Sequence, residues 1–262
     1  MLALVRRPGP ALADGLVTHI ERTPVSLPLA VAQWHAYVAA LADHGWRTHE
    51  VPPADDCPDA VFIEDTVVMY RDVAVITRPG APSRRDETPA VRTTVESLDY
   101  RVHELQAPAT LDGGDILKVG DVVYAGRGGR TNAAGIAALH AALEPLGARV
   151  VAVPVAKVLH LKSAVTALPD GTVIGYPPLV DDPDVFPTFL PVPEESGAHV
   201  VDLGHDRLLI STTAPKTIEL LKTRGYTPVP VDITEYEKLE GCVTCLSVRL
   251  RHHPNTPPAP PG

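Results

Sequence analysis

The chain has 262 residues, a net charge of −9 at pH 7 and 45% hydrophobic residues, enough for one large hydrophobic core or two small ones. The acidic balance without a basic cluster argues against nucleic acid as a partner, and no apolar run approaches the roughly 18 residues of a membrane span. The N-terminus has no secretion-signal pattern, and the three cysteines have no disulfide-framework spacing. We therefore expect a cytoplasmic protein with no membrane partner.

The N-terminal part predicts a strand, a long loop, a helix and a second strand. The first strand is expected within residues 2–8, the helix within 29–46 and the return strand within 47–52. The loop from Arg7 to Pro28 shows no periodicity, and loops of this length in compact domains often act as lids. We expect this loop to close over a binding site.

The same order of elements recurs further along the chain. Residues 74–105, 122–153 and 207–231 each predict an apolar strand, a turn, an amphipathic helix and a β-branched strand. Gly147 and Gly225 are expected to end the helices of the second and third of these segments.

A weaker copy and two additional strand regions complete the pattern. Residues 171–193 are so rich in proline that little helix is expected there, and extra strands are expected within 59–70 and 114–124. Five related α/β units favour a closed, pseudosymmetric ring, although an ordinary doubly wound α/β domain would show similar alternation. We expect one domain over residues 1–251 and a disordered proline-rich tail at 252–262.

Two cysteines near the C-terminus, Cys242 and Cys245, form a C-x-x-C pair. A structural zinc site would need about four ligands, and no second pair completes one. A redox pair usually lies at a helix start, whereas a strand is expected here. Cys245 is then either a small buried side chain or a nucleophile that works with a distant histidine. His160, in the apolar stretch LHLKSAVTAL, is the candidate partner.

Four acidic residues lie in or beside apolar strands, where burying a charge is costly unless it is paired or functional. Glu64 and Asp65 are adjacent, so in a strand their side chains would point to opposite faces. Asp112 and Asp115 flank two glycines, and aspartates in such turns often only bond their own backbone. The turn explanation accounts less well for Glu64 and Asp65.

Two arginines, Arg84 and Arg130, occupy equivalent positions just before the helices of two repeats. A surface arginine at such a turn is common, but in a ring these two side chains would converge on a common axis. Their planar guanidinium groups are suited to clamping a carboxylate.

With these residues assembled, the sequence resembles the dimethylarginine dimethylaminohydrolases, members of the guanidino-group-modifying superfamily. The resemblance extends to about Arg251 and is carried by DGL (14–16), PDAVFIEDT (58–66), ITRPGAPSRRDET (76–88), LDGGDIL (111–117), RTNAAG (130–135), HLK (160–162) and GCVTCLSVRL (241–250). It implies the pentein fold, a five-bladed α/β propeller of ββαβ units.

The resemblance also implies a role for each candidate residue. Cys245 would be the nucleophile, His160 the general acid/base, and Asp112 (glutamate in some relatives) the acid that orients His160. Substrate binding would involve Glu64 and Asp65 at the guanidinium and, at the amino-acid end, Asp59, Arg84 and Arg130 with the backbones of Leu16 and Leu239. No metal or other cofactor is implied. The expected partner is a small cationic amino acid, a methylated arginine, and a homodimer is an open expectation.

The implied reaction is hydrolysis of asymmetric dimethylarginine or monomethylarginine to citrulline and dimethylamine or methylamine, through a covalent cysteine S-alkylthiouronium. Arginine deiminases and amidinotransferases share this chemistry, but those relatives are longer than 262 residues. A small arginine deiminase, a hydrolase of another guanidine and a non-catalytic methylarginine-binding protein remain as alternatives. The last of these would not need both Cys245 and His160.

Overall fold

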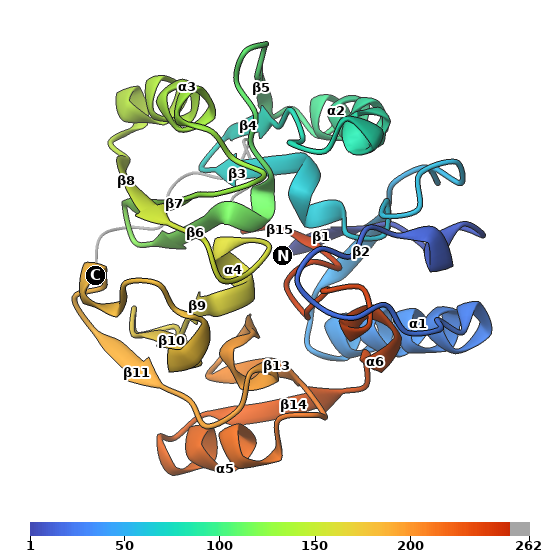
Figure 1. Ribbon diagram of the computed structural model, residues 1–262, viewed down its shortest axis with the longest axis vertical. Helices are drawn as coiled ribbons and strands as arrows, with labels where there is room; N and C mark the ends of the chain where they lie inside the picture. Colours follow the sequence, from blue (N-terminus) through green and yellow to red (C-terminus); the bar gives the residue numbers. More distant parts are fainter. Residues whose placement is uncertain (252–262) are drawn as a thin grey trace.

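The strands form small sheets arranged as blades around a central axis, with the longer helices at the rim (Figure 1). The computed structural model describes residues 1–251, and the expected tail at 252–262 lies outside the described residues. Within residues 1–251 there are five sheets of three strands each, in these orders: β15 (Val248–Leu250), β1 (Leu2–Val5), β2 (Arg47–Glu50); β3 (Val67–Tyr70), β4 (Val73–Ile76), β5 (Arg101–Glu104); β6 (Ile116–Val119), β7 (Val122–Arg127), β8 (Arg149–Pro154); β9 (Val165–Ala167), β10 (Val173–Gly175), β11 (Phe189–Pro191); and β12 (Val200–Gly204), β13 (Arg207–Ser211), β14 (Thr227–Val231).

The α-helices of the described chain differ widely in length. They are α1 (Leu27–Asp43), α2 (Thr88–Ser97), α3 (Ala133–Leu143), α4 (Leu161–Ala164), α5 (Pro215–Thr223) and α6 (Thr234–Glu237). No helix in residues 1–251 combines the length and the apolar character that a bilayer crossing requires.

Every blade repeats one connectivity. Its first two strands are antiparallel and its second and third are parallel, so the crossover between the parallel strands can carry a helix. The blade of β9, β10 and β11 has only the short 3-10 helices η6 (Pro177–Leu179) and η7 (Pro183–Val185) in its crossover, because proline interrupts helical hydrogen bonding. The predicted five-bladed ββαβ propeller is confirmed, including its weak copy at residues 171–193.

The middle strand of each blade sends alternate side chains into two different hydrophobic cores. In β4, Val73 and Val75 pack with β7, whereas Ala74 and Ile76 pack with Leu4 of the neighbouring blade. The same alternation runs through β1, β7, β10 and β13, so five clusters lie between successive blades and close the ring. The alternative of one doubly wound sheet is therefore excluded for residues 1–251.

The first strand of each blade lies nearest the axis. All four residues of β3 are buried, whereas three of the four residues of the outer strand β5 are exposed. The segments that lead into the first strands therefore meet near the centre of the ring. Among them are η2 (Ile63–Thr66) before β3, η4 (Gly113–Asp115) before β6, and α4 before β9.

Candidate active site

A small pocket of about 20 Å³ brings together most of the expected site residues. Its lining includes eight of the ten: Leu16, Asp59, Asp65, Arg84, Arg130, His160, Leu239 and Cys245. Four further residues complete it, namely Phe62, Leu159, Glu240 and Gly241. The sequence did not single out these four residues, because neither their side-chain chemistry nor their spacing distinguishes them from ordinary core or loop residues.

Cys245 lies in the turn before β15 and is buried, beside a second free thiol. Its sulfur lies 3.3 Å from the Cys242 sulfur and accepts a 3.4 Å hydrogen bond from the Cys242 backbone N–H. Contact with Cys242, burial and the charges of Glu64 and Asp65 raise the pKa of the Cys245 thiol well above its ordinary value. The same contact lowers the pKa of Cys242. Cys245 itself therefore rests as the protonated thiol.

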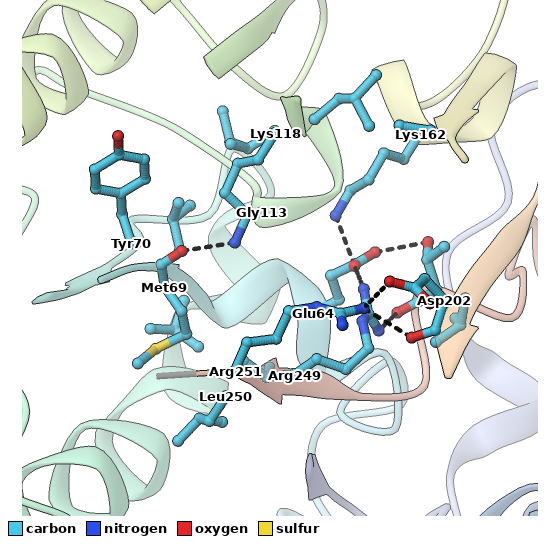
Figure 2. Close-up of a pocket in the computed structure, with 18 of the residues that line it drawn as sticks. Glu64, Met69, Tyr70, Gly113, Lys118, Lys162, Asp202, Arg249, Leu250 and Arg251 are labelled. Carbon is cyan, nitrogen blue, oxygen red and sulfur yellow. Dashed lines mark hydrogen bonds and ion pairs between the residues drawn. The ribbon is translucent and has the colours of Figure 1, made fainter. Parts of the chain in front are cut away.

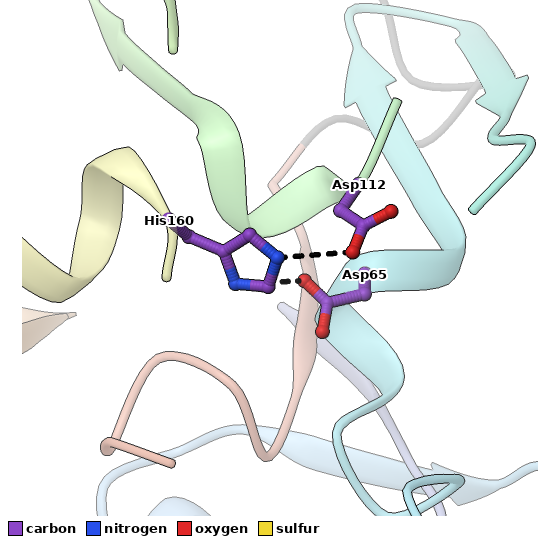
Figure 3. Close-up of side chains that lie close together, drawn as sticks. All are labelled: Asp65, Asp112 and His160. Carbon is purple, nitrogen blue, oxygen red and sulfur yellow. Dashed lines mark hydrogen bonds and ion pairs between the residues drawn. The ribbon is translucent and has the colours of Figure 1, made fainter. Parts of the chain in front are cut away.

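His160 directly precedes α4 and is 4% exposed. Its Nε2 lies 3.0 Å from Asp112 Oδ2 and its Nδ1 lies 3.8 Å from Asp65 Oδ1 (Figure 3). Burial alone would lower the pKa of the imidazole, but the charge of Asp65, the hydrogen bond to Asp112 and other nearby carboxylates raise that pKa to about 9. The ring is therefore an imidazolium at neutral pH and can donate a proton.

Asp112 is fully buried, and both of its oxygens have partners. Oδ1 accepts a 2.8 Å hydrogen bond from the Gly80 backbone N–H. Oδ2 contacts the imidazole of His160 and, at 3.5 Å, Arg130. This geometry fits the expected role of orienting the imidazole.

Asp115, for which the sequence left a turn role and a catalytic role open, supports the next segment of chain. Its carboxylate accepts a 3.0 Å hydrogen bond from the Leu161 backbone N–H and a bond from the Thr131 hydroxyl. Burial raises the pKa of Asp115 to about 6. Because Leu161 directly follows His160, Asp115 fixes the backbone that carries the imidazole.

Asp65 is held from two sides. Oδ2 accepts a 2.6 Å hydrogen bond from Arg84 and Oδ1 a 2.8 Å bond from the Gly114 backbone N–H. A Cβ at position 114 would lie 2.6 Å from both Asp65 Oδ1 and His160 Nδ1, so only glycine permits this close approach. Burial opposes ionisation of Asp65, but the charges of His160 and Arg84 lower its pKa to about 2. The group is a carboxylate in the resting site.

Arg84 uses most of its donors inside the protein. It bonds Asp65, both oxygens of Glu87 at 3.0 and 2.8 Å, and the carbonyls of Asp59 and Phe62 at 3.3 Å. This arrangement favours a role in fixing Asp65 over the expected role at the substrate carboxylate. Removing one partner from such a buried cluster costs about 3–5 kcal/mol.

Arg130 and Asp59 remain better placed for an amino-acid ligand. Arg130 meets Asp112 at 3.5 Å, a long contact that leaves its guanidinium fork available at the pocket. Asp59 accepts hydrogen bonds from the Leu16 backbone N–H at 3.0 and 3.2 Å. Burial raises the pKa of Asp59, with Arg84 opposing the shift, and the carboxylate ties the Arg7–Pro28 loop to the pocket.

Glu64 departs from its expected place at the guanidinium. It is absent from the pocket lining, and its carboxylate bonds Thr244 at 2.8 Å, Lys162 at 2.6 Å and Arg249 at 2.8 Å. The segment is the 3-10 helix η2 rather than a strand, and successive side chains of such a helix point about 120° apart. Asp65 is therefore the member of the adjacent pair that faces the pocket.

The cluster of Asp65, Asp112 and His160 has the composition of a metal site, with one ligand atom from each residue within 4.8 Å of the others (Figure 3). However, its carboxylate oxygens already accept hydrogen bonds from Gly114, Gly80 and arginine donors. The arrangement is better suited to holding the His160 imidazolium than to coordinating a metal ion.

The Arg7–Pro28 loop lies against the pocket and is fastened by acidic residues of the C-terminal part. The Glu240 carboxylate accepts hydrogen bonds from the backbone N–H groups of Thr18 and His19, and the Glu235 carboxylate accepts one from the Ser26 N–H. About 10–15 Å³ of this kind of cavity volume holds one water, so a pocket of about 20 Å³ has room for one or two waters rather than for an amino acid. A ligand can enter only if part of the lining moves.

Comparisons with known proteins give a consistent family and fold assignment. The family model described as Arginine deiminase matches residues 40–211. N(G),N(G)-dimethylarginine dimethylaminohydrolase of Streptomyces coelicolor is 69% identical over 249 residues, which cover 95% of this chain and 96% of the relative. The solved structure of DDAH from Pseudomonas aeruginosa, a cysteine-to-serine mutant complexed with citrulline, has a TM-score of 0.89 at 34% identity and covers 95% of this chain and 98% of that chain.

A more distant solved structure shares the fold. The N-terminal domain of ArgZ, an arginine dihydrolase from cyanobacteria, has a TM-score of 0.86 at 21% identity and covers 96% of this chain and 98% of that chain. At this identity the likeness concerns the fold alone.

Proposed function

The chain belongs to the dimethylarginine dimethylaminohydrolase family, and we propose on that basis that it hydrolyses N-omega-methylated arginines to citrulline and dimethylamine or methylamine. One observation carries the proposal: a single pocket is lined by Cys245, His160, Asp65 and Arg130. These side chains supply a nucleophile, a proton donor, an anion for the guanidinium and a cation for the substrate carboxylate.

Substrate recognition follows from the charges. The Asp65 carboxylate holds the guanidinium and fixes its plane, so that the carbon presents one face to the sulfur. Arg130 binds the carboxylate of the amino acid, while the Asp59 carboxylate accepts a hydrogen bond from the ammonium group of the same ligand. The backbones of Leu16 and Leu239 border the same end of the pocket.

Catalysis takes place in two steps. The arriving cation offsets the carboxylate charges that oppose ionisation of Cys245, so the thiol loses its proton to solvent in the complex and the resulting thiolate attacks the guanidinium carbon. His160 gives its proton to the methylated nitrogen as the C–N bond breaks, which leaves an S-alkylthiouronium on Cys245 and releases the amine. Water then loses a proton to His160 and adds to the same carbon, and the C–S bond breaks to yield citrulline.

A small arginine deiminase is the second candidate, because the matching family model carries that description. It would use the same residues and release ammonia. The two activities differ in the leaving amine alone, so competition between substrates decides between them.

The experiment measures citrulline from asymmetric dimethylarginine, monomethylarginine and arginine with the purified chain. We expect turnover of the methylated substrates, slower turnover of arginine, and a loss on the order of a thousandfold or more in Cys245→Ser. Cys57→Ser is the matched control, since Cys57 is also buried and free but lies outside the pocket. Preferred turnover of arginine would identify a deiminase, and equal activity in Cys245→Ser would refute the mechanism.

A further inference from the structure

A second cavity of about 550 Å³ lies between the first strands of all five blades. Its lining shares no residue with the catalytic pocket. Glu64 and Thr244 line the cavity, whereas their chain neighbours Asp65 and Cys245 line the catalytic pocket. The cavity and the catalytic pocket therefore lie on opposite sides of the same two segments of chain, at residues 64–65 and 244–245.

The walls of this cavity are basic, although the chain as a whole carries a net charge of −9. Four cationic side chains face two carboxylates, and the full set is Lys118, Lys162, Arg249 and Arg251 with Glu64 and Asp202 (Figure 2). An additional ion pair, Arg71 with Asp121 at 3.3 Å, also borders the cavity. Positive charge therefore exceeds negative charge inside the cavity.

The carboxylates in the cavity are already shared or committed. Lys162 and Arg249 both approach the same oxygen of Glu64, at 2.6 and 2.8 Å. Arg251 pairs with Asp202 at 3.1 Å. No described carboxylate is left over for a further cation.

Lys118 is the cation without a counter-charge. Its ammonium donates a 2.6 Å hydrogen bond to the Met69 carbonyl, and it forms no ion pair with any residue of the described chain (Figure 2). Although the Lys118 side chain reaches solvent in the cavity, desolvation by the surrounding walls and the charges of Lys162 and Arg249 lower its pKa to about 7. The Lys118 side chain is exposed to the cavity, so water supplies its remaining hydrogen-bond acceptors, but no described carboxylate forms an ion pair with it.

We propose that the cavity binds a small dianion, a phosphate or a dicarboxylate, between Lys118 and Lys162. Such a ligand supplies the counter-charge that the described chain does not provide to Lys118 and forms charge-assisted hydrogen bonds with its ammonium. The volume accommodates a phosphate, a phosphate ester or a short dicarboxylate together with water. Neither the citrulline product nor a methylated arginine has this charge, so the site is independent of the proposed reaction.

The proposal predicts a proton linkage. Lys118 faces the cations and carboxylates of the other walls and, near the edge, Tyr70, Tyr100 and the Arg71–Asp121 pair. Only the protonated form of Lys118 attracts the anion. For succinate, which stays a dianion in this range, the affinity therefore falls as pH rises through about 7, and binding above that pH is accompanied by proton uptake. The observed enthalpy of binding therefore depends on the ionisation enthalpy of the buffer.

Isothermal titration calorimetry with inorganic phosphate and with succinate, at constant ionic strength in chloride, tests the site. We expect saturable binding of one dianion per chain and a loss of about tenfold or more in Lys118→Met. Lys216→Met removes one charge from the rim helix α5 and should leave the affinity unchanged. Arg130→Met removes the cation of the catalytic pocket and should also leave it unchanged.

Three results would overturn the proposal: no saturable binding of either dianion, equal affinity in Lys118→Met, or loss of affinity in Arg130→Met instead. Binding of phosphate without succinate would restrict the ligand to phosphate chemistry and still support the site. Circular dichroism confirms that each variant is folded, and Lys118→Arg, which keeps the charge, should restore binding.

Discussion

His160 acquires its properties from carboxylates that arrive on different blades. Asp65 comes from the segment before β3, and Asp112 and Asp115 come from the segment around η4 before β6. The sequence separation between these groups hides their contact, yet together they convert an ordinary imidazole into a stable imidazolium. The energetic consequence can be measured without substrate.

We predict that the His160 imidazole titrates near pH 9 and that Asp112→Asn lowers its pKa by about one unit or more, because a charged hydrogen-bond acceptor is replaced by a neutral one. The measurement is an NMR titration of histidine-labelled protein in a Cys245→Ser background, which removes the thiol from the titration. An unchanged imidazole pKa in Asp112→Asn would show that Asp112 does not orient or charge the ring.

The same shift links stability to pH. A folded-state pKa of about 9, raised from 6.5, means that His160 contributes stability fully below about pH 6.5 and loses that contribution as pH rises through about 9. The shift corresponds to about 3 kcal/mol at most. The free energy of unfolding of Asp112→Asn should therefore fall less between about pH 6.5 and pH 9 than that of the parent protein.

Most of the residues that the sequence grouped together line one pocket, but the sequence did not indicate which way each side chain points. Adjacent carboxylates at positions 64 and 65 were expected to point to opposite faces of a strand; they lie on the 3-10 helix η2 instead and line two different compartments. Which of them faces the substrate depends on Lys162, Arg249 and Thr244, whose proximity to Glu64 follows from ring closure. The second cavity could not be predicted from any one stretch of the sequence either. Each blade contributes only one or two of its charged residues, and ring closure brings them together.

The elements were predicted well where periodicity is strong and poorly near the axis. The rim helices and outer strands follow amphipathic patterns and glycine stops, such as Gly225 at φ 88°. An extra strand was expected within residues 59–70; it covers only Val67–Tyr70, and the 3-10 helix η2 precedes it. That segment bends so that Asp65 and Glu64 reach different compartments, a tertiary requirement that periodicity does not encode.

We infer that the Arg7–Pro28 loop moves to admit a ligand, because it lies against the pocket and is held there by Asp59 and Glu240. We predict that Glu240→Gln speeds trypsin cleavage after Arg22 several-fold in the ligand-free protein, because a neutral amide holds the Thr18 and His19 N–H groups less strongly than a carboxylate. Citrulline should restore protection by holding the loop closed.

Glu237→Gln serves as the matched control for this prediction. The Glu237 carboxylate bonds the hydroxyls of Ser211 and Thr213, away from the loop, so its cleavage rate should equal that of the parent. Equal rates in Glu240→Gln and the parent, with and without citrulline, would show that the loop is not a lid held by Glu240.

The chain ends divide one blade of an otherwise regular ring. In four blades the first strand directly precedes the second along the chain, but in the blade of β15, β1 and β2 the first strand comes from the C-terminal part. Leu250 pairs with Leu2 in antiparallel register. The end of β15 therefore lies beside the start of β1, where the other blades have a hairpin.

A circular permutant should consequently fold. Joining residue 251 to Met1 through a short Asn-Gly hairpin linker restores the ββαβ order in the divided blade. New ends can be placed between His205 and Asp206, which form the turn from β12 to β13 with positive φ values of 52° and 59°. We expect a free energy of unfolding within about 2 kcal/mol of the parent and unchanged citrulline turnover, since no core contact is lost.

The control permutant carries the same linker but is opened between Leu208 and Leu209, whose side chains pack into two different cores from the buried middle strand β13. It should fail to give a cooperative urea transition, because the break removes a strand that holds two interblade clusters together. If stability depends on closure of the ring, the first permutant folds and the second does not. If both fold, each blade is stable on its own, and the alternating cores do not account for the cooperativity of the molecule.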